Sequence, residues 1–204
     1  GFSWWCDRLE RALALTPRVR IDHFRGFASY WSVPQGAQDA RDGRWIDGPG
    51  EAIFAAFRER IGSYLPVIAE DLGLIDKPVR DLLTVTGLPG MKVLQFAFGG
   101  SHDHIYLPHN HESNSVVYTG THDNDTTLGW WRQASDQVQD HVRRYFGING
   151  HDLVWDFIRA ALASGSQTAV LPMQDILALG SEARMNTPSL PQGNWGWRLP
   201  ADGL

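Results

Sequence analysis

Hydrophobic residues along this chain follow two spacings that alternate from one end to the other. Trp5, Leu9 and Leu13 recur at the four-residue interval of an amphipathic helix, and Pro17 ends the pattern. The same pattern predicts helices over residues 4–15, 51–61, 77–86, 133–146 and 151–163. Short apolar runs predict strands over residues 18–22, 65–70, 91–98, 116–119 and 168–171. Because strands that are apolar throughout are buried on both faces, this alternation predicts an α/β protein with a parallel sheet.

Two segments lack either spacing. Residues 31–50 are rich in Gly, Pro, Gln and Asp and are predicted to form a long loop, which usually has a function. Residues 184–204 contain Pro, Gly, Asn and Trp without periodicity and are predicted to form an irregular tail. Since no internal repeat and no obvious linker divides the chain, residues 1–204 are interpreted as one domain.

Three acidic residues stand where predicted strands end. Asp22 and Glu70 end the first two strands, and Asp123 closely follows the fourth. The C-terminal strand ends of an α/β barrel carry its active site, so we expect the three carboxylates to serve one site. Asp22 and Glu70 are 48 residues apart, and Glu70 and Asp123 are 53 apart. At about 31 residues per βα unit, the first interval is one unit lengthened by a long loop, and the second is nearly two units.

The length of the chain limits this barrel. A complete (β/α)8 TIM barrel has about 250 residues, whereas this chain has 204 and about five predicted βα units. The chain also begins at Gly1 without an initiator methionine, as if in the middle of a helix. We therefore expect the C-terminal part of a barrel domain whose N-terminal strands are missing, in a fragment of a longer protein.

Composition and charge exclude several classes of protein. The 18 Lys and Arg residues against 23 Asp and Glu residues give a net charge of −5, which argues against a nucleic-acid partner. No apolar run approaches the roughly 20 residues of a membrane helix. The single cysteine, Cys6, excludes an internal disulfide and favours a reducing compartment, the cytoplasm or a plastid. The oligomeric state is not indicated by the sequence.

Two of the acids have surroundings that suit the cleavage of a glycosidic bond by a retaining mechanism, which needs a nucleophilic carboxylate and a carboxylic acid. Asp22 lies between Arg20 and Arg25, two permanent cations that favour its ionised form and a role as nucleophile. Glu70 follows an apolar run and adjoins Asp71, so burial and like charge favour a protonated form and a role as general acid and base.

The third acid lies among hydrogen-bonding side chains. Asp123 stands between His122 and Asn124, a group suited to gripping sugar hydroxyls and stabilising the transition state. Any one of the three acids by itself is more simply explained as a helix cap or ion-pair partner. The occurrence of three at strand ends with consistent spacing favours catalysis.

Other groupings are explained without a ligand. The group His102, Asp103, His104, His109 and His111 lacks the fixed spacing of a zinc helix, so no metal site is predicted. The Trp130-Trp131 pair and the Trp195-Gly196-Trp197 segment are more typical of packing than of sugar platforms. No glycine-rich phosphate loop is present, and we expect no cofactor, because side chains supply both the nucleophile and the proton.

The same segments resemble those of a known family. Residues 20–26 (RIDHFRG), 68–73 (IAEDLG) and 120–126 (GTHDNDT) are similar to the nucleophile, acid/base and third-acid segments of the 4-α-glucanotransferases of the amylomaltase or disproportionating-enzyme family, in the α-amylase clan. Further similar segments are 30–34 (YWSVP), 48–50 (GPG), 90–98 (GMKVLQFAF), 171–175 (LPMQD), 184–188 (RMNTP) and 194–198 (NWGWR). The resemblance covers essentially the whole chain.

The resemblance implies an activity and further site residues. It implies a retaining enzyme that moves α-1,4-glucan segments from a donor to an acceptor through a glycosyl-Asp22 ester, acting on maltooligosaccharides, starch or glycogen chains. It gives Asp22, Glu70 and Asp123 the roles assigned above. Contacts with sugar implied by the resemblance are Arg20, His23, His122 and Asn186, and we add Asp71 and Asn124 as substrate contacts. Trp31 is a hypothetical acceptor-side contact.

Two alternatives remain open at this point. A retaining α-glucan hydrolase would use the same three carboxylates with water as the acceptor. An inactive, aromatic-rich fragment that binds glucan would turn nothing over. Product analysis distinguishes the first, and binding without turnover would indicate the second.

Overall fold

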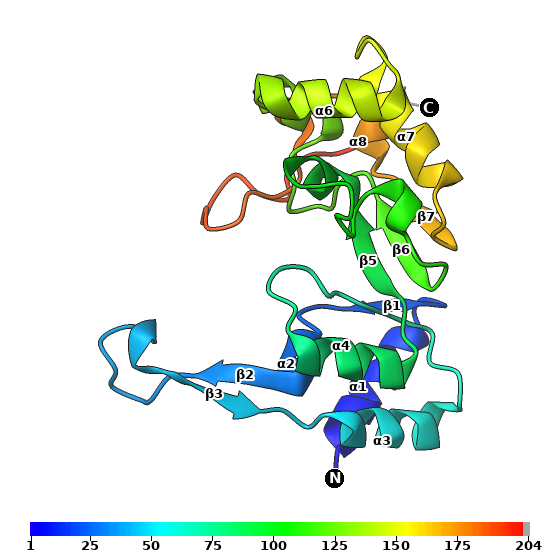
Figure 1. The fold of residues 1–204 in the computed structure, drawn as a ribbon. Helices are drawn as coiled ribbons and strands as arrows, with labels where there is room; N and C mark the ends of the chain where they lie inside the picture. The colour runs from blue at the N-terminus through cyan, green and yellow to red at the C-terminus, as the bar shows by residue number, and fades with distance from the viewer. Residues whose placement is uncertain (202–204) are drawn as a thin grey trace. The chain divides into compact units, whose positions relative to one another are not determined.

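The computed structural model describes residues 1–201 (Figure 1). They belong to two compact units, of which the first is Gly1–Met91 and the second begins at Lys92. Each unit has its own hydrophobic core. The first unit contains α1 (Ser3–Leu13), β1 (Val19–Ile21), α2 (Arg25–Ala28), β2 (Ser29–Ser32), η1 (Ala40–Asp42), β3 (Arg44–Asp47), α3 (Glu51–Ile61), β4 (Val67–Ala69), α4 (Lys77–Thr86) and the start of β5 (Gly90–Val93). The second contains η2 (Leu94–Gly99), η3 (Pro108–Asn110), β6 (Ser115–Tyr118), α5 (Thr127–Gln133), α6 (Asp136–Phe146), α7 (Leu153–Ala163), β7 (Thr168–Val170), α8 (Met173–Ile176) and η4 (Ser181–Ala183).

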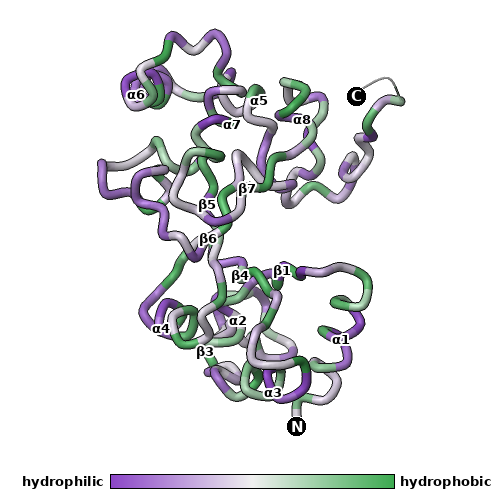
Figure 2. The backbone as a smooth tube through the Cα atoms, turned by 90° about the vertical axis from the view of Figure 1, so that its right-hand side faces the viewer, coloured by the Kyte–Doolittle hydropathy of each residue, from purple (hydrophilic) through white to green (hydrophobic). Residues whose placement is uncertain are grey.

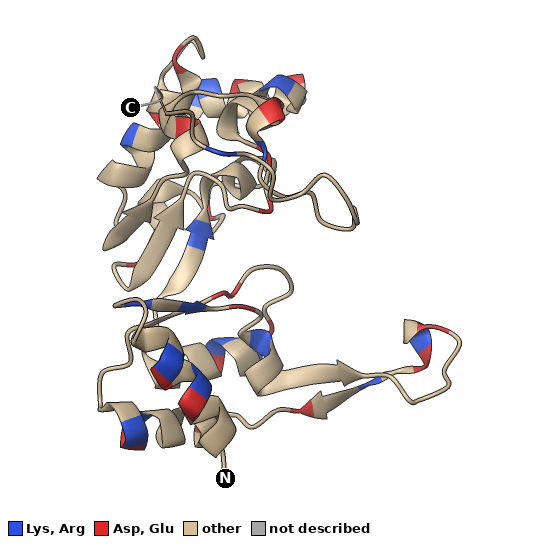
Figure 3. Cartoon of the chain, turned by 180° about the vertical axis from the view of Figure 1, so that it is seen from behind, with Lys and Arg blue, Asp and Glu red and all other residues tan. Residues whose placement is uncertain are grey.

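The first unit packs its helices against a pair of parallel strands. β1 pairs with β4 in the register Val19↔Val67, and every residue of β4 is buried. The aromatic rings of Phe24, Phe54 and Phe57 form the centre of the core, each no more than 1% exposed. Ion pairs join α1 to α3 at the surface, where Figure 3 shows acidic and basic residues intermixed. The core therefore fixes the position of β1 and β4, whose C-terminal ends precede Asp22 and Glu70.

An antiparallel hairpin occupies the segment that was predicted to be a loop. β2 and β3 pair in the register Trp31↔Trp45, and η1 lies in the connection between them (Figure 1). The predicted loop is therefore correct for the connection over residues 33–43, which contains the short η1, and wrong for residues 31–32 and 44–47, which form strands. Its glycine and proline residues lie mainly in the turns, whereas two four-residue strands are stabilised by the cross-strand contact of Trp31 with Trp45, at 5.4 Å between ring centroids.

The second unit has three strands in the order β5-β6-β7, and β6 is parallel to β7. Phe98 and Phe157, both almost fully buried, contact each other and further rings in the core. The helix α6 has one buried residue, Val142, and Figure 2 shows this helix as largely hydrophilic. None of the helices within residues 1–201 has the length and apolar character that crossing a bilayer requires.

The predicted helices and strands agree in part with these elements. The predicted bounds of α3 and α4 are the observed ones, and all five predicted strands overlap observed strands. The strand predicted over residues 91–98 ends at Val93 and continues as the 3-10 helix η2, because a buried apolar run does not distinguish a strand from a buried helical turn. The helix predicted over residues 133–146 begins at Asp136, where the Ser135 hydroxyl caps it. The tail contains no helix or strand from Arg184 to residue 201.

Candidate active site

The candidate nucleophile segment follows β1. Arg20 Nη2 lies 2.6 Å from Asp22 Oδ1, and the Asp22 side chain is 77% exposed. Arg20 Nε lies 3.3 Å from the sulfur of Met91, so the guanidinium is held between the carboxylate and the start of β5. Arg25 does not contribute the second cation that the sequence suggested. Its Nη2 pairs with Asp76 at 2.7 Å.

The candidate acid/base segment is joined to the nucleophile segment by hydrogen bonds. The backbone N–H of His23 donates to Glu70 Oε2 at 2.7 Å, and that of Leu72 donates to Glu70 Oε1 at 2.9 Å. The N–H of Phe24 also donates to the carbonyl oxygen of Glu70 at 3.0 Å. His23 has φ 51°, a strained conformation for a residue other than glycine, and this turn directs its N–H at Glu70. The residue that follows Asp22 thus holds the carboxylate of Glu70.

Asp71 points toward the beginning of β5. Its Oδ1 accepts a hydrogen bond from the backbone N–H of Met91 at 2.7 Å. A Cβ atom at Gly90 would lie 2.5 Å from Asp71 Oδ2, so this close approach requires glycine. The structure therefore shows a bond from Asp71 to the backbone, and its contact with a substrate remains a prediction.

Trp31 lies on the hairpin. Its indole N–H donates to the carbonyl oxygen of Ala40 at 2.7 Å, and its ring meets that of Trp45 edge to face. The guanidinium of Arg25 lies over the ring of Trp45 in a cation–π contact, with Cζ 4.3 Å from the ring centroid. The side chain of Trp31 is held in one orientation while 43% of its surface stays exposed.

The third acid lies in a short loop between β6 and α5. Asn124 Oδ1 accepts hydrogen bonds from the N–H and the hydroxyl of Thr121, at 2.9 and 2.8 Å, which closes the loop on itself. Asp123 Oδ1 accepts from Asn186 Nδ2 at 2.6 Å and lies 3.5 Å from His122 Nε2. The structure thus brings His122, Asp123 and Asn186 together, although 63 residues separate the last two.

The C-terminal tail packs against this loop. The N–H of Asn186 donates to the carbonyl oxygen of His122 at 3.1 Å. The rings of His122 and Trp195 lie with centroids 5.2 Å apart. Arg184 Nη2 donates to the carbonyl oxygen of Asp123 at 2.7 Å. A segment without regular secondary structure therefore supplies a large part of the surroundings of Asp123.

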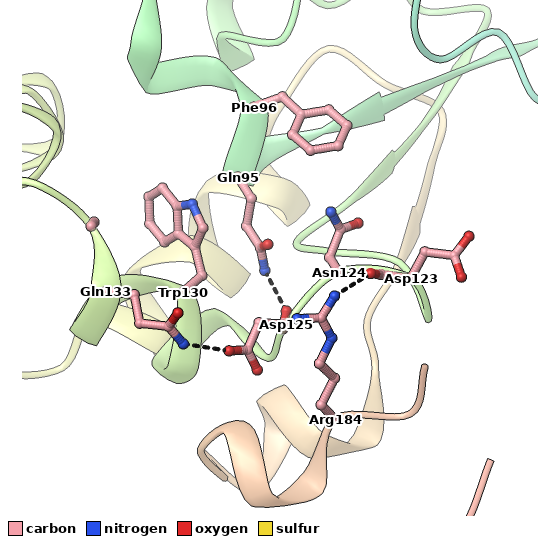
Figure 4. A pocket seen from close by; sticks show the side chains of 9 residues that line it. Gln95, Phe96, Asp123, Asn124, Asp125, Trp130, Gln133 and Arg184 are labelled. Atoms are coloured by element: carbon pink, nitrogen blue, oxygen red, sulfur yellow. Dashed lines mark hydrogen bonds between the residues drawn. The ribbon is translucent and has the colours of Figure 1, made fainter. Parts of the chain in front are cut away.

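A cavity of about 280 Å³ opens beside Asp123 in the second unit (Figure 4). Gln95 Nε2 donates to the carbonyl oxygen of Asp125 at 2.9 Å, and Gln133 Nε2 donates to Asp125 Oδ2 at 2.9 Å. Figure 4 shows both hydrogen bonds together with the bond from Arg184 to Asp123. Its lining residues are Gln95, Phe96, Asp123, Asn124, Asp125, Trp130, Gln133, Ala134 and Arg184. Amide and carboxylate groups beside two aromatic rings suit a polyhydroxylated ligand.

The buried carboxylate of Asp175 bonds to residues at both ends of the loop that contains Asp123. Asp175, at the end of the LPMQD segment, is 1% exposed. Its Oδ1 accepts from the N–H of Thr127, and its Oδ2 accepts from the hydroxyls of Thr119 and Thr127. These bonds join α8 to the end of β6 and to the start of α5. The segment was noticed only for its resemblance, since neither spacing nor charge distinguishes Asp175.

The histidine-rich segment belongs to the same unit and has partners of its own. His109 Nδ1 lies 2.8 Å from the hydroxyl of Tyr145, and His111 Nε2 lies 2.9 Å from the carbonyl oxygen of Tyr106. Burial is the main cause that lowers the pKa of His111 below 6.5. Within residues 1–201 no three His, Cys, Asp or Glu side chains are grouped so as to hold a metal ion.

The structure thus assembles the predicted site residues in two groups, one in each unit. Arg20, Asp22, His23 and Glu70 are linked within the first, and His122, Asp123 and Asn186 within the second. Sequence reasoning missed Arg184, whose only signal was its place in a segment that resembles the family.

Comparison with known proteins identifies the family. A family model described as 4-alpha-glucanotransferase matches residues 1–202. The chain is 53% identical to a chloroplastic/amyloplastic 4-alpha-glucanotransferase of Arabidopsis thaliana, over 98% of this chain and 35% of the relative. It is 50% identical to the 4-alpha-glucanotransferase of Thermus thermophilus, over 98% of this chain and 41% of the relative.

Solved structures agree with this result. An amylomaltase from Streptococcus agalactiae in complex with acarbose superposes with a TM-score of 0.93 at 37% identity, over 99% of this chain and 41% of that chain. An amylomaltase from Corynebacterium glutamicum shares the fold, with a TM-score of 0.76 at 20% identity over 96% of this chain and 33% of that one. The chain spans well under half of the length of these relatives. The mixed α/β fold with parallel strands is therefore that of an amylomaltase, and the chain belongs to the 4-alpha-glucanotransferase family.

Proposed function

We propose that this chain carries the catalytic carboxylates of a retaining 4-α-glucanotransferase, which moves segments of α-1,4-glucan from a donor to an acceptor. Its 204 residues would then be the C-terminal part of a (β/α)8 barrel domain. Membership of the family supports the activity, and the amylomaltase solved with acarbose supports an α-glucan as the ligand.

The observation that carries this proposal is the hydrogen bond from the N–H of His23 to Glu70 Oε2, at 2.7 Å. It connects the carboxylate of Glu70 to the residue next to Asp22. A retaining mechanism needs two carboxyl groups about 5 to 5.5 Å apart, which requires their two loops to be in direct contact. The second carboxylate, Asp22, is paired with Arg20 at 2.6 Å.

The proposed reaction has two steps. In the first, an Asp22 oxygen bonds to the anomeric carbon while the bond from that carbon to the glycosidic oxygen breaks, and Glu70 gives its proton to the departing oxygen. In the second, the 4-hydroxyl of an acceptor glucan attacks the same carbon, Asp22 leaves, and Glu70 takes the hydroxyl proton. Side chains supply every group, so no cofactor is required.

The remaining site residues have proposed roles in binding. Asp123, held by Asn186 at 2.6 Å, would stabilise the positive charge that develops on the sugar ring. Arg20, His23, Asp71, His122, Asn124 and Asn186 are proposed as substrate contacts. Trp31, with an indole fixed by its bond to Ala40, is proposed as an acceptor-side platform.

Incubation with maltotriose tests the proposal. Transfer produces glucose together with maltopentaose and longer chains, which chromatography resolves. Asp22→Asn should lower the rate at least about 1,000-fold, as loss of a covalent nucleophile does. The matched control is Asp81→Asn, which removes an exposed carboxylate of the same unit that pairs with Lys77 and should leave the rate unchanged.

Three results would contradict the assignment. Glucose and maltose without longer products would indicate a hydrolase. Full activity in the Asp22→Asn variant would exclude Asp22 as the nucleophile. Binding of maltotriose without any product, by a chain shown to be folded, would indicate a glucan-binding protein.

A further inference from the structure

The guanidinium of Arg184 donates two hydrogen bonds, one to the loop of Asp123 and one to the tail itself. Its Nη2 donates to the carbonyl oxygen of Asp123 at 2.7 Å, and its Nε donates to that of Asn186 at 2.8 Å. The two carbonyls belong to the residues whose side chains bond to each other at 2.6 Å. One side chain therefore connects both backbones that carry the Asp123–Asn186 pair. Figure 4 shows the bond from Arg184 to Asp123.

The shape of the guanidinium makes this connection rigid. Its N–H groups lie in one plane at fixed angles, so two carbonyl oxygens bound to it are held at a defined separation. The group is half-buried and lines the cavity beside Asp123.

We infer that Arg184 is a positioning residue, which sets the distance and angle between Asp123 and Asn186 without touching the substrate itself. This inference rests on the proposed function, in which Asp123 stabilises the transition state. Without the guanidinium, three contacts among the described residues would still hold the tail to this loop: the Asn186 side-chain bond, the Asn186 N–H bond to His122 and the ring contact of Trp195.

The chain contains a matched control for this role. Arg198 lies in the same tail, and its Nη1 also donates to two carbonyl oxygens, those of Trp195 and Trp197, each at 2.8 Å. It is exposed, and both of these bonds are to the backbone of the tail rather than to Asp123 or Asn186. Arg184→Met and Arg198→Met therefore remove the same kind of interaction, and only the first should affect the Asp123–Asn186 pair.

The first measurement is hydrogen exchange on the 204-residue chain, which needs no activity. The amide of Asn186 donates to His122, and that of Asn124 donates to Thr121. In Arg184→Met both amides should exchange about 10-fold faster, because local opening becomes easier, while Arg198→Met should leave them unchanged. Unchanged exchange in Arg184→Met would overturn the inference.

The second measurement is transfer from maltotriose. Arg184→Met should lower kcat about 100-fold with KM changed less than about threefold, because misplacement of a group that acts in the transition state reduces kcat. Arg184→Lys keeps the charge without the planar fork and should recover about 10-fold of this loss. A kcat within twofold of the wild type in Arg184→Met, or an equal loss in Arg198→Met, would refute the role.

The two measurements separate this inference from the proposed function. If the wild-type chain transfers nothing, the proposed function fails for this chain, and the exchange rates still decide whether Arg184 orders the pair. If the chain is active and both measurements fail, the function stands and Arg184 has no positioning role.

Discussion

The buried carboxylate of Asp175 provides the sharpest test of the energetics of this structure. Its oxygens accept three hydrogen bonds, from the N–H and hydroxyl of Thr127, each at 2.8 Å, and from the hydroxyl of Thr119. Asp175→Ala would leave these three donors buried without an acceptor. A hydrogen bond to a charged group contributes about 1.5–3 kcal/mol. At the lower value of this range, the three bonds together give an expected loss of about 4.5 kcal/mol.

A conservative variant separates the hydrogen bonds from the charge. In Asp175→Asn one oxygen remains for the N–H of Thr127, and the new amide can donate to the two threonine hydroxyls, which also accept. The expected loss is then only about 1–2 kcal/mol. Against a total stability of about 5–15 kcal/mol, the alanine variant should be severely destabilised and the asparagine variant should stay folded.

Urea denaturation, followed by circular dichroism and tryptophan fluorescence, measures both losses. The control is Asp140→Ala on α6, whose half-exposed carboxylate pairs with Arg144 and should contribute less than about 1 kcal/mol. An Asp175→Ala variant within about 1 kcal/mol of the wild type would refute the reasoning, because three buried donors would then have found other partners. Equal losses in the alanine and asparagine variants would show that the charge dominates.

Two further predictions concern other contacts. Gly90→Ala should destabilise the first unit by about 1–3 kcal/mol in urea denaturation, because the new Cβ would lie 2.5 Å from Asp71 Oδ2. The control is Gly1→Ala, whose Cβ would meet no atom within 4 Å and which should leave the stability unchanged. Gly87 cannot serve as the control, because its φ of 65° would strain an alanine. Burial lowers the pKa of His111 below 6.5, so the unfolded chain binds the proton more readily, and the free energy of unfolding should fall as the pH is lowered below about 6.5. His111→Gln should reduce this slope, and an identical slope in wild type and variant would contradict the assignment.

The sequence predicted the regular elements where local signals were strong. α3 and α4 were predicted with their observed bounds, because glycine stands at both ends of α3 and Asp76 caps α4 before Pro78. The hairpin was missed because its strands have four residues each and are stabilised mainly by a contact across the strands. The helices α2 and α8 were missed because four residues are too few for a periodic pattern.

The sequence predicted the charged side chains of the candidate site but not the backbone groups that hold them. Asp22, Glu70 and Asp123 could be proposed as site residues because strand ends and neighbouring charges are visible in the sequence. The donors that hold Glu70 are backbone N–H groups, which every residue except proline possesses and which leave no signature. Arg184 was missed because its partners are carbonyl oxygens, one of them 61 residues away.

These backbone donors have an evolutionary consequence. Glu70 is held by the N–H groups of His23 and Leu72, and Asp71 by that of Met91. A change of side chain at any of these three positions leaves its donor in place unless the new residue is proline. Sequence drift can therefore alter the shape and polarity of the surroundings while both carboxylates keep their anchors. The anchors of the two carboxylates are thus insulated from most side-chain changes at positions 23, 72 and 91, and these three positions are free to diverge.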